Sequence, residues 1–150
     1  YGLWPSKETE EAFKRKIKLE PVLSWKTIVV QIKQLSKGSG VGYDLTETLG
    51  LPSRVAVLPI GYWHGFPRAL SGIGKVLIKG REAKVLGRVS MDMISVDITE
   101  VKNVKVRDEA IIIGKSGKLE ISADDIANMS DTINYEIVTR LNPLMKRIVV

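Results

Sequence analysis

Apolar residues occupy alternate positions in several short stretches of this 150-residue chain, which is the period of a half-buried β-strand. The clearest cases have one apolar face formed by Ile28, Val30 and Ile32 and another formed by Ile94, Val96 and Ile98. Residues 55–60 are apolar on both faces, and this pattern predicts a central strand. Further strands are expected at residues 76–78 and 85–86 with a glycine-bearing turn between them, at 110–113 before Gly114 and Gly117, and at 147–150.

Two short helices are expected late in the chain. Ser122 and Asp125 have the spacing of a capping box, which predicts a helix that continues to Asn128. A second helix would begin around residues 131–132 and stop at Asn142-Pro143, and its apolar stripe would consist of Ile133, Ile137 and Leu141. Many short strands with two short helices predict a mainly β fold, an antiparallel Greek-key-type barrel or sandwich.

Size and composition fit one globular domain. A chain of this length buries roughly two-thirds of its unfolded surface, and its composition, 44% hydrophobic and 27% charged, is typical of soluble proteins. The longest apolar run, residues 55–60, contains Pro59 and falls far short of the roughly 20 residues of a membrane-spanning helix. The chain opens without an initiator Met or a secretory signal, so we expect a fragment or a processed product, with the cytoplasm as the default location.

The first residues differ in character from the rest of the chain. Residues 1–4 are mainly apolar and are stopped by Pro5, so they are interpreted as the end of a preceding unit. Residues 6–18 form a charged connector with helical leanings. We therefore expect the β domain to span residues 19–150.

The net charge of +6 raises the question of a nucleic-acid partner. The only dense basic run, Lys14-Arg15-Lys16, is offset by Glu10 and Glu11, which stand four residues before Lys14 and Arg15 and would form the ordinary pairs of a solvated helix. We expect neither nucleic acid nor a membrane as a partner. A stand-alone basic β-barrel that binds nucleic acid stays open as an alternative, because Trp25-Lys26 places an aromatic ring beside a cation.

Several common site motifs are excluded. The chain has no cysteine and a single histidine, His64, so neither a thiolate zinc site nor a histidine cluster can form, and no metal is expected. Residues 38–43 nearly match a dinucleotide fingerprint, but Tyr43 stands at the third glycine and no helix pattern follows. Gly114-Lys115-Ser116 lacks the upstream glycine of a phosphate-binding loop, and the chain has no Gly-x-Ser-x-Gly elbow.

Four segments carry a more specific pattern, and they are Val41-Gly42-Tyr43, residues 58–68, residues 87–92 and residues 132–136. In this order and at these separations they resemble the C-terminal domain of alanine racemases, and the resemblance runs from Tyr1 to Val150. It implies that residues 1–18 are the end of the family's α/β barrel and a linker. It also implies that the cofactor-binding barrel lies outside this chain.

The resemblance implies an amino-acid racemase that uses pyridoxal 5'-phosphate and interconverts L- and D-alanine. Racemisation removes a proton from one face of Cα and returns one on the other, so two acid/base groups flank the substrate, and the cofactor acts as an electron sink. In the family a barrel lysine serves one face and a tyrosine of the partner subunit serves the other. By motif match that tyrosine is Tyr43. We therefore expect a homodimer with shared active sites, and an isolated chain that is inactive because it lacks the lysine.

Further site residues follow from the same resemblance. Met91 matches a residue whose backbone N–H binds the substrate carboxylate. Tyr135 matches a tyrosine near the cofactor phosphate, and it would point away from the apolar stripe of its helix. The resemblance implies a narrow substrate entrance that is lined by Tyr62, Arg68, Arg88 and Ile133. For the two arginines a plain surface role is an equal alternative.

The chain departs from the family pattern at a few positions. Trp63-His64 stand where the family usually has Ala-Asp, Ser90 where it usually has Cys, and Asp44 where it often has Gly. Because Trp63 is large enough to reshape the entrance, a racemase of another small amino acid, such as serine, stays open. A related barrel-plus-β decarboxylase is disfavoured, because those enzymes do not usually show the four segments together.

Overall fold

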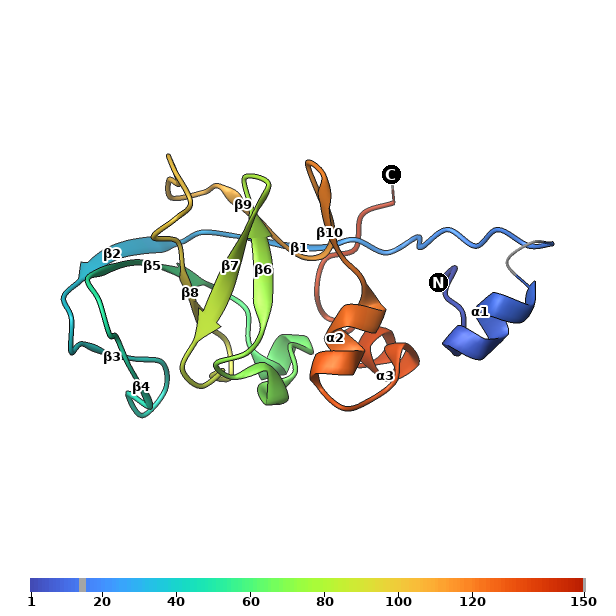
Figure 1. Cartoon of the computed structure of the whole chain (residues 1–150), viewed down its shortest axis with the longest axis horizontal. Helices are drawn as coiled ribbons and strands as arrows, with labels where there is room; N and C mark the ends of the chain where they lie inside the picture. Colours follow the sequence, from blue (N-terminus) through green and yellow to red (C-terminus); the bar gives the residue numbers. More distant parts are fainter. Residues whose placement is uncertain (14–15, 150) are drawn as a thin grey trace.

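Antiparallel strands make up most of the regular structure in the computed structural model of the chain, which describes residues 1–13 and 16–149 (Figure 1). The strands are β1 (Trp25–Ile28), β2 (Gln31–Leu35), β3 (Gly40–Val41), β4 (Glu47–Thr48), β5 (Ser53–Leu58), β6 (Lys75–Ile78), β7 (Arg81–Leu86), β8 (Ile94–Asp97), β9 (Glu109–Ser116) and β10 (Leu119–Ile121). The helices are α1 (Lys7–Phe13), α2 (Ala123–Met129) and α3 (Asn134–Thr139), with 3-10 turns at Tyr62–His64 and Arg68–Leu70. The mainly β, antiparallel fold is thus confirmed.

The main sheet curls around its core because its two end strands belong to one chain segment. Its order is β1-β9-β6-β7-β8-β5-β2, with β10 paired to β9, while β3 and β4 form a separate ribbon. Only Val29 and Val30 separate β1 from β2. The Val29 N–H donates to the Asp108 carbonyl (2.9 Å) and the Val30 N–H to the Val57 carbonyl (3.0 Å), so the segment passes from one end of the sheet to the other. No ladder between β1 and β2 closes the described sheet into a barrel.

This change of partner overturns the alternation expected around residue 30. Ile28 and Val30 are 45% and 40% exposed, whereas Val29 between them is fully buried. Each half of the segment pairs with a different strand, so one continuous face of Ile28, Val30 and Ile32 does not exist.

The other central strands follow their sequence patterns. β5 lies between β8 and β2 and buries Val55, Ala56 and Leu58, as the apolar run at 55–60 predicts. β6 and β7 form the expected hairpin, and both turn residues, Lys79 and Gly80, have left-handed backbone (φ 50° and 72°). This is the conformation that two-residue hairpin turns favour.

The predicted ends of the strand pattern need correction. β9 does not end at Gly114 but runs to Ser116, and after the turn at Gly117 the chain returns as β10, which no sequence pattern predicted. The strand expected at residues 147–150 does not form over 147–149, and Val150 lies outside the described residues. Ile148 and Val149 are exposed, so they lack the burial that would stabilise a strand.

Both predicted helices form, although the second begins later than expected and ends at Thr139, before the Asn142-Pro143 stop. The Ser122 hydroxyl accepts the Asp125 N–H (3.0 Å), and the Asp125 carboxylate accepts the Ser122 N–H (2.8 Å), which confirms the capping box of α2. Asp131 has left-handed backbone (φ 54°), so α3 starts only at Asn134. The N-cap residue Ile133 is 60% exposed and does not belong to the apolar stripe, whose other members, Ile137 and Leu141, are buried.

The core lies between the curled sheet and the pair α2 and α3, with Phe66 fully buried in it. A second, smaller cluster joins the β3-β4 ribbon to the sheet, and it consists of Val41, Leu49, Val55 and Leu86. Helix α1 buries no residue, and the N-terminal segment is tied back where the Asn134 amide donates to the Trp4 carbonyl (2.8 Å). Lys14 and Arg15, and hence their expected pairs with Glu10 and Glu11, lie outside the described residues. The domain boundary at residue 19 stays a prediction.

Candidate active-site edge

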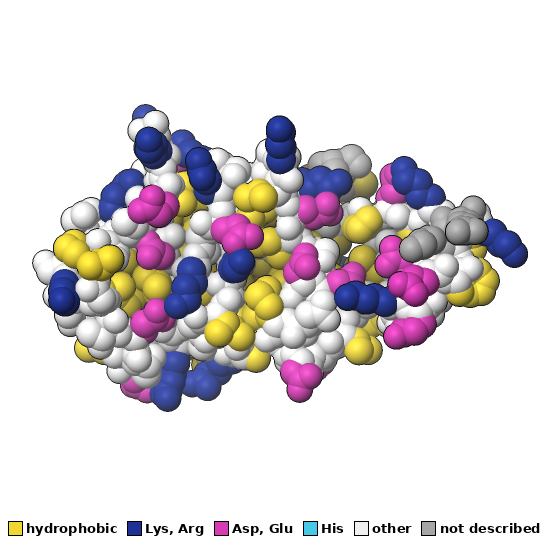
Figure 2. Space-filling view, viewed as in Figure 1, with side chains coloured by type: hydrophobic (Ala, Val, Ile, Leu, Met, Phe, Trp, Pro, Cys, Tyr) yellow, Lys and Arg dark blue, Asp and Glu magenta, His cyan; other side chains and the backbone are white. Residues whose placement is uncertain are grey.

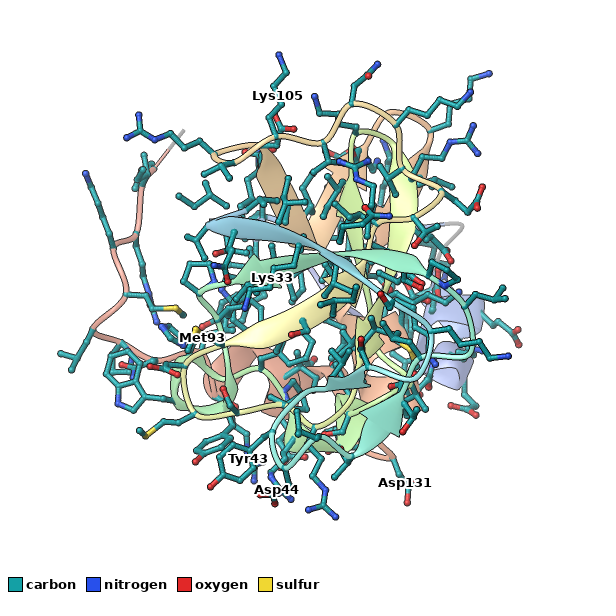
Figure 3. The ribbon with its side chains drawn as sticks, turned by 90° about the vertical axis from the view of Figure 1, so that its left-hand side faces the viewer. Lys33, Tyr43, Asp44, Met93, Lys105 and Asp131 are labelled. Carbon is teal, nitrogen blue, oxygen red and sulfur yellow. The ribbon has the colours of Figure 1, made fainter. Side chains whose placement is uncertain are left out.

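The four specific segments lie along one long edge of the molecule, the lower edge of Figure 1. We call residues 41–45, 58–68, 87–92 and 132–136 together the site edge. Figure 3 shows Tyr43 and Asp44 side by side at this edge, whereas Lys105 lies at the opposite one. Segments up to about ninety positions apart in sequence are therefore brought together, and backbone contacts hold most of them.

Two glycines allow the Tyr43 loop to cross the end of β7. A Cβ on Gly87 would lie 2.4 Å from the Val41 carbonyl oxygen, and a Cβ on Gly42 would lie 2.7 Å from the Arg88 nitrogen. Both glycines have left-handed backbone, with φ of 84° and 64° for Gly42 and Gly87. The close crossing lets the Tyr43 N–H donate to the Arg88 carbonyl (3.4 Å) and leaves the Tyr43 side chain 59% exposed.

Charged side chains reinforce the same crossing. The Arg88 guanidinium pairs with the Asp44 carboxylate (3.4 Å), and Asp44 has left-handed backbone (φ 60°), a conformation for which glycine is the usual residue. The Glu47 carboxylate accepts the Gly87 N–H (2.6 Å) and also pairs with Lys84 (3.2 Å). Glu47 was missed in the sequence because a lone acid in a turn-rich stretch carries no pattern.

Met91 sits at the tip of a tight loop that Ser90 stabilises. The Ser90 hydroxyl donates to the Met93 carbonyl (2.7 Å) and accepts the Met93 N–H (3.1 Å). The Ser90 N–H also donates to the Met93 carbonyl (3.2 Å). Within the described part of the chain the Met91 N–H makes no hydrogen bond, so it is available to an anionic group.

The Tyr62–His64 turn docks on this loop through its backbone. The Tyr62 N–H donates to the Ser90 carbonyl (3.1 Å) and the Trp63 N–H to the Met91 carbonyl (2.9 Å). A Cβ on Gly61 would lie 2.3 Å from the Ser90 carbonyl oxygen, so only glycine permits this approach. The side chains of Tyr62 and Trp63 are 49% and 47% exposed.

A shallow cavity of about 560 Å³ lies between residues 62–69 and the start of α3. Tyr62 and Arg68 line one side of it, and Glu136 and Arg140 line the other, where they form an i,i+4 ion pair (2.7 Å). The Thr132 hydroxyl donates to the Glu136 carboxylate. Two of the four predicted entrance residues, Tyr62 and Arg68, therefore share one cavity.

The remaining predicted residues, Ile133 and Tyr135, lie at the start of α3 on the site edge. Ile133 is 60% exposed, and Tyr135, on the first turn of α3, is 42% exposed and points away from the buried stripe as predicted. Neither the Tyr43 nor the Tyr135 hydroxyl has a hydrogen-bond partner among the described residues. Tyr62 and Arg68 thus line a cavity, whereas Tyr43, Met91, Ile133 and Tyr135 are exposed on an open face.

Two observations bear on the other classes of function. Trp25 is buried and packs at 6.3 Å from Phe66, while Lys26 pairs with Glu109 (3.2 Å), so this aromatic is not free to stack on a base. On the face in Figure 2, acidic and basic side chains are interspersed. Among residues 1–13 and 16–149, no group of His, Asp and Glu could hold a metal ion, and no helix is long and apolar enough to cross a membrane.

Comparison with protein families decides between these classes. Residues 22–149 match the family model described as alanine racemase, C-terminal domain. The chain belongs to the alanine racemase C-terminal domain family. An alanine racemase of Halothermothrix orenii is 46% identical over 147 residues, and one of Clostridium perfringens is 43% identical over 148. These matches cover 98% and 99% of this chain but only 38% of each relative, so the chain spans about two-fifths of the length of these relatives.

Solved alanine racemases share this fold. The structure from Bacillus anthracis with bound L-Ala-P has a TM-score of 0.87 at 38% identity, and the match covers 94% of this chain and 35% of the Bacillus anthracis chain. The structure from Bartonella henselae with covalently bound pyridoxal phosphate has a TM-score of 0.82 at 32% identity, covering 90% and 37%. The site edge therefore lies on a domain with the fold of an alanine racemase C-terminal domain.

Proposed function

We propose that the chain is the C-terminal part of a pyridoxal-phosphate-dependent alanine racemase and acts in a homodimer, where its site edge covers the barrel of the partner subunit. The observation that carries the proposal is that the Tyr43 hydroxyl and the Met91 N–H have no hydrogen-bond partner among the described residues, although backbone contacts fix their segments on one open edge. Groups arranged in this way are ready to act on a substrate that another domain holds.

In this proposal Tyr43 is the acid/base group for one face of Cα. A phenol has an ordinary pKa of about 10 and needs a nearby cation or donors to act as a base near neutral pH. The Arg88 guanidinium is engaged by Asp44. We therefore expect the group that tunes Tyr43 to come from the barrel of the complete protein.

Met91 would bind the substrate carboxylate through its free N–H, in a loop that Ser90 and the Tyr62–His64 turn hold in place. Tyr62 and Arg68 would line the entrance beside the cavity, and Arg88 and Ile133 would extend it along the edge. Each of these side chains is exposed, which an entrance formed between two subunits requires.

Tyr135 would contact the cofactor. Its phenol is exposed on the first turn of α3, and its hydroxyl has no hydrogen-bond partner among the described residues, which suits a contact to a phosphate oxygen. When bound, pyridoxal phosphate withdraws electrons from Cα and makes its proton removable. The attachment lysine and the rest of the cofactor site would lie in the barrel.

The role of Tyr43 is tested by Tyr43→Phe in the complete protein. Removing one acid/base group lowers racemisation by about 10²–10⁴-fold. Exchange of the Cα hydrogen with deuterated solvent, followed by NMR for each enantiomer separately, should be lost for one and retained for the other. Equal loss for both would contradict the assignment and indicate a structural role. Parallel rates for alanine and serine would show which amino acid the complete protein prefers.

The isolated chain should not racemise alanine when pyridoxal phosphate is added, because it lacks the lysine of the family. We also expect no absorbance change typical of a stable imine. Activity of the chain alone, or such an absorbance change, would overturn the view that it supplies only one side of the active site.

A further inference from the structure

The only histidine of the chain caps the turn that carries Tyr62 and Trp63. His64 Nδ1 accepts the Gly61 N–H at 3.1 Å. An imidazole nitrogen that accepts a hydrogen bond carries no proton, so Nδ1 acts here as the acceptor and Nε2 is left as the ring donor. The Gly61 N–H is buried and would otherwise lose a partner on folding.

The capped turn also holds the Met91 peptide in place. The Tyr62 N–H donates to the Ser90 carbonyl (3.1 Å), which lies in the same planar peptide unit as the Met91 N–H. The Trp63 N–H donates to the Met91 carbonyl (2.9 Å), and the Gly61 backbone lies directly against both carbonyl groups. Asn142 secures the turn from its other side, since its side-chain amide donates to the Trp63 carbonyl (2.9 Å) and its N–H to the His64 carbonyl (3.3 Å). The direction of the Met91 N–H therefore depends on the geometry of this turn.

We propose that His64 is a positioning residue for binding of the substrate carboxylate. By accepting the Gly61 N–H, His64 keeps the Tyr62–His64 turn seated on the Ser90-Met91 peptide and so aims the free Met91 N–H at the carboxylate. This inference rests on the proposed function and adds to it a residue that touches neither the substrate nor the reacting atoms.

The imidazole also makes an edge-on contact with Trp63, with ring centroids 4.9 Å apart. Two roles of His64 therefore have to be separated, namely the acceptor at Nδ1 and the ring surface. Asparagine places a carbonyl oxygen where Nδ1 lies but removes the ring surface, glutamine places its polar atoms further out, and alanine removes both.

The test compares His64→Asn, His64→Gln and His64→Ala in the complete protein by steady-state kinetics with alanine. One lost hydrogen bond corresponds to about a three- to tenfold rise in KM for the Gln and Ala variants. Because a carboxylate contact is made equally in the ground and transition states, kcat should change by less than about twofold. His64→Asn should restore KM to near the wild-type value. An unrestored KM, or a fall in kcat at constant KM, would overturn the proposal.

Ser122→Ala is the control, because it removes a side-chain cap in α2, where the Ser122 hydroxyl accepts the Asp125 N–H and donates to the Asp125 carboxylate, outside the site edge. It should lower stability and leave KM unchanged, and an equal rise in KM would reveal a general effect of destabilisation.

A second readout does not depend on racemase activity. In the chain itself, hydrogen exchange of the Gly61 amide should be slow in wild type and His64→Asn and about three- to tenfold faster in His64→Ala. Equal exchange in all three would exclude the cap even if the complete protein proves not to be a racemase.

Discussion

Gly42 and Gly87 decide where Tyr43 stands. Their backbones cross so closely that a Cβ on either would overlap the other segment. The position of the candidate acid/base group thus depends on two residues that have no side chain and no chemistry of their own.

Gly87→Ala should therefore destabilise the chain by about 3 kcal/mol, since it adds a steric overlap to the cost of left-handed backbone. Two controls separate these causes in urea unfolding. Gly38→Ala has left-handed backbone but open space around the new Cβ and should cost about 1 kcal/mol. Gly50→Ala has neither problem and should stay within about 0.5 kcal/mol of wild type. A Gly87→Ala variant as stable as Gly38→Ala would show that the crossing can relax.

Two departures from the family pattern acquire local roles in the structure. Ser90 makes reciprocal hydrogen bonds with Met93 that keep the Met91 loop tight, and Asp44 provides the partner of Arg88. The Asp44–Arg88 pair is exposed, so its contribution to stability is small.

At the scale of elements, the residues at the helix starts determine where α2 and α3 begin. The capping box at Ser122 starts α2, and the left-handed Asp131 delays the start of α3. Tyr135 and Ile133 reach the site edge because α3 begins where it does.

Two serines at the ends of α2 should respond in opposite ways to replacement by alanine. Ser122→Ala loses an N-cap and should cost about 1 kcal/mol. Ser130 ends α2 with a buried hydroxyl that has no hydrogen-bond partner among the described residues, so Ser130→Ala should be neutral or stabilising by up to about 1 kcal/mol. Thermal unfolding of both variants checks this, and a clear loss of stability in Ser130→Ala would mean that its hydroxyl has a partner in solution.

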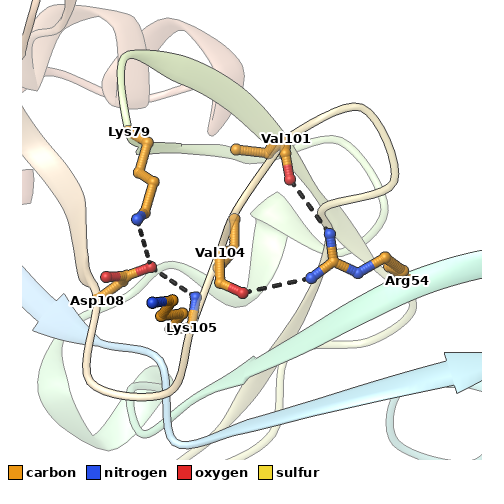
Figure 4. A network of polar contacts seen from close by, with 6 residues as sticks. All are labelled: Arg54, Lys79, Val101, Val104, Lys105 and Asp108. Carbon is orange, nitrogen blue, oxygen red and sulfur yellow. Dashed lines mark hydrogen bonds and ion pairs between the residues drawn. The ribbon is translucent and has the colours of Figure 1, made fainter.

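At the scale of the whole molecule, polar contacts hold the long loop after β8 at the edge opposite the site (Figure 4). The Arg54 guanidinium donates to the Val101 (3.4 Å) and Val104 (3.3 Å) carbonyls. Asp108 accepts the Lys105 N–H (2.6 Å) and pairs with Lys79 (3.1 Å) from the β6-β7 hairpin. The Lys105 N–H, followed by Lys79, lowers the pKa of Asp108 below its ordinary value.

This lowered pKa predicts how stability depends on pH. The folded chain holds Asp108 ionised more readily than the unfolded chain does, so the stabilisation is complete above the ordinary pKa of about 4. It is lost as the pH falls through the lower, folded-state pKa. The difference in urea stability between wild type and Asp108→Asn should therefore shrink from pH 6 to pH 3. A difference that stays constant over this range would contradict the coupling.

Local sequence patterns correctly predicted the elements that are determined by residues within the element itself. The β6-β7 hairpin, the central β5 and the α2 capping box depend on residues close together in the chain. The face of residues 28–32 was predicted wrongly because the segment changes its partner strand at Val29. The partner strands, β9 and β5, lie far away in the sequence, so the segment's own residues do not reveal the change. The candidate site residues were found through a resemblance, since no local pattern marks Tyr43 or Met91 as chemically active.

The sequence by itself determined the antiparallel class, the capped α2, the family resemblance and the identity of the candidate groups, because each follows from residue types at short or matched spacings. Only the tertiary structure decided that Tyr43 crosses Arg88, that the Met91 N–H is left free and that His64 caps the turn against Met91. The contacts of Tyr43 with Arg88 and of the Tyr62–His64 turn with the Met91 loop join segments that are distant in sequence through backbone groups, which every residue carries and no sequence pattern distinguishes.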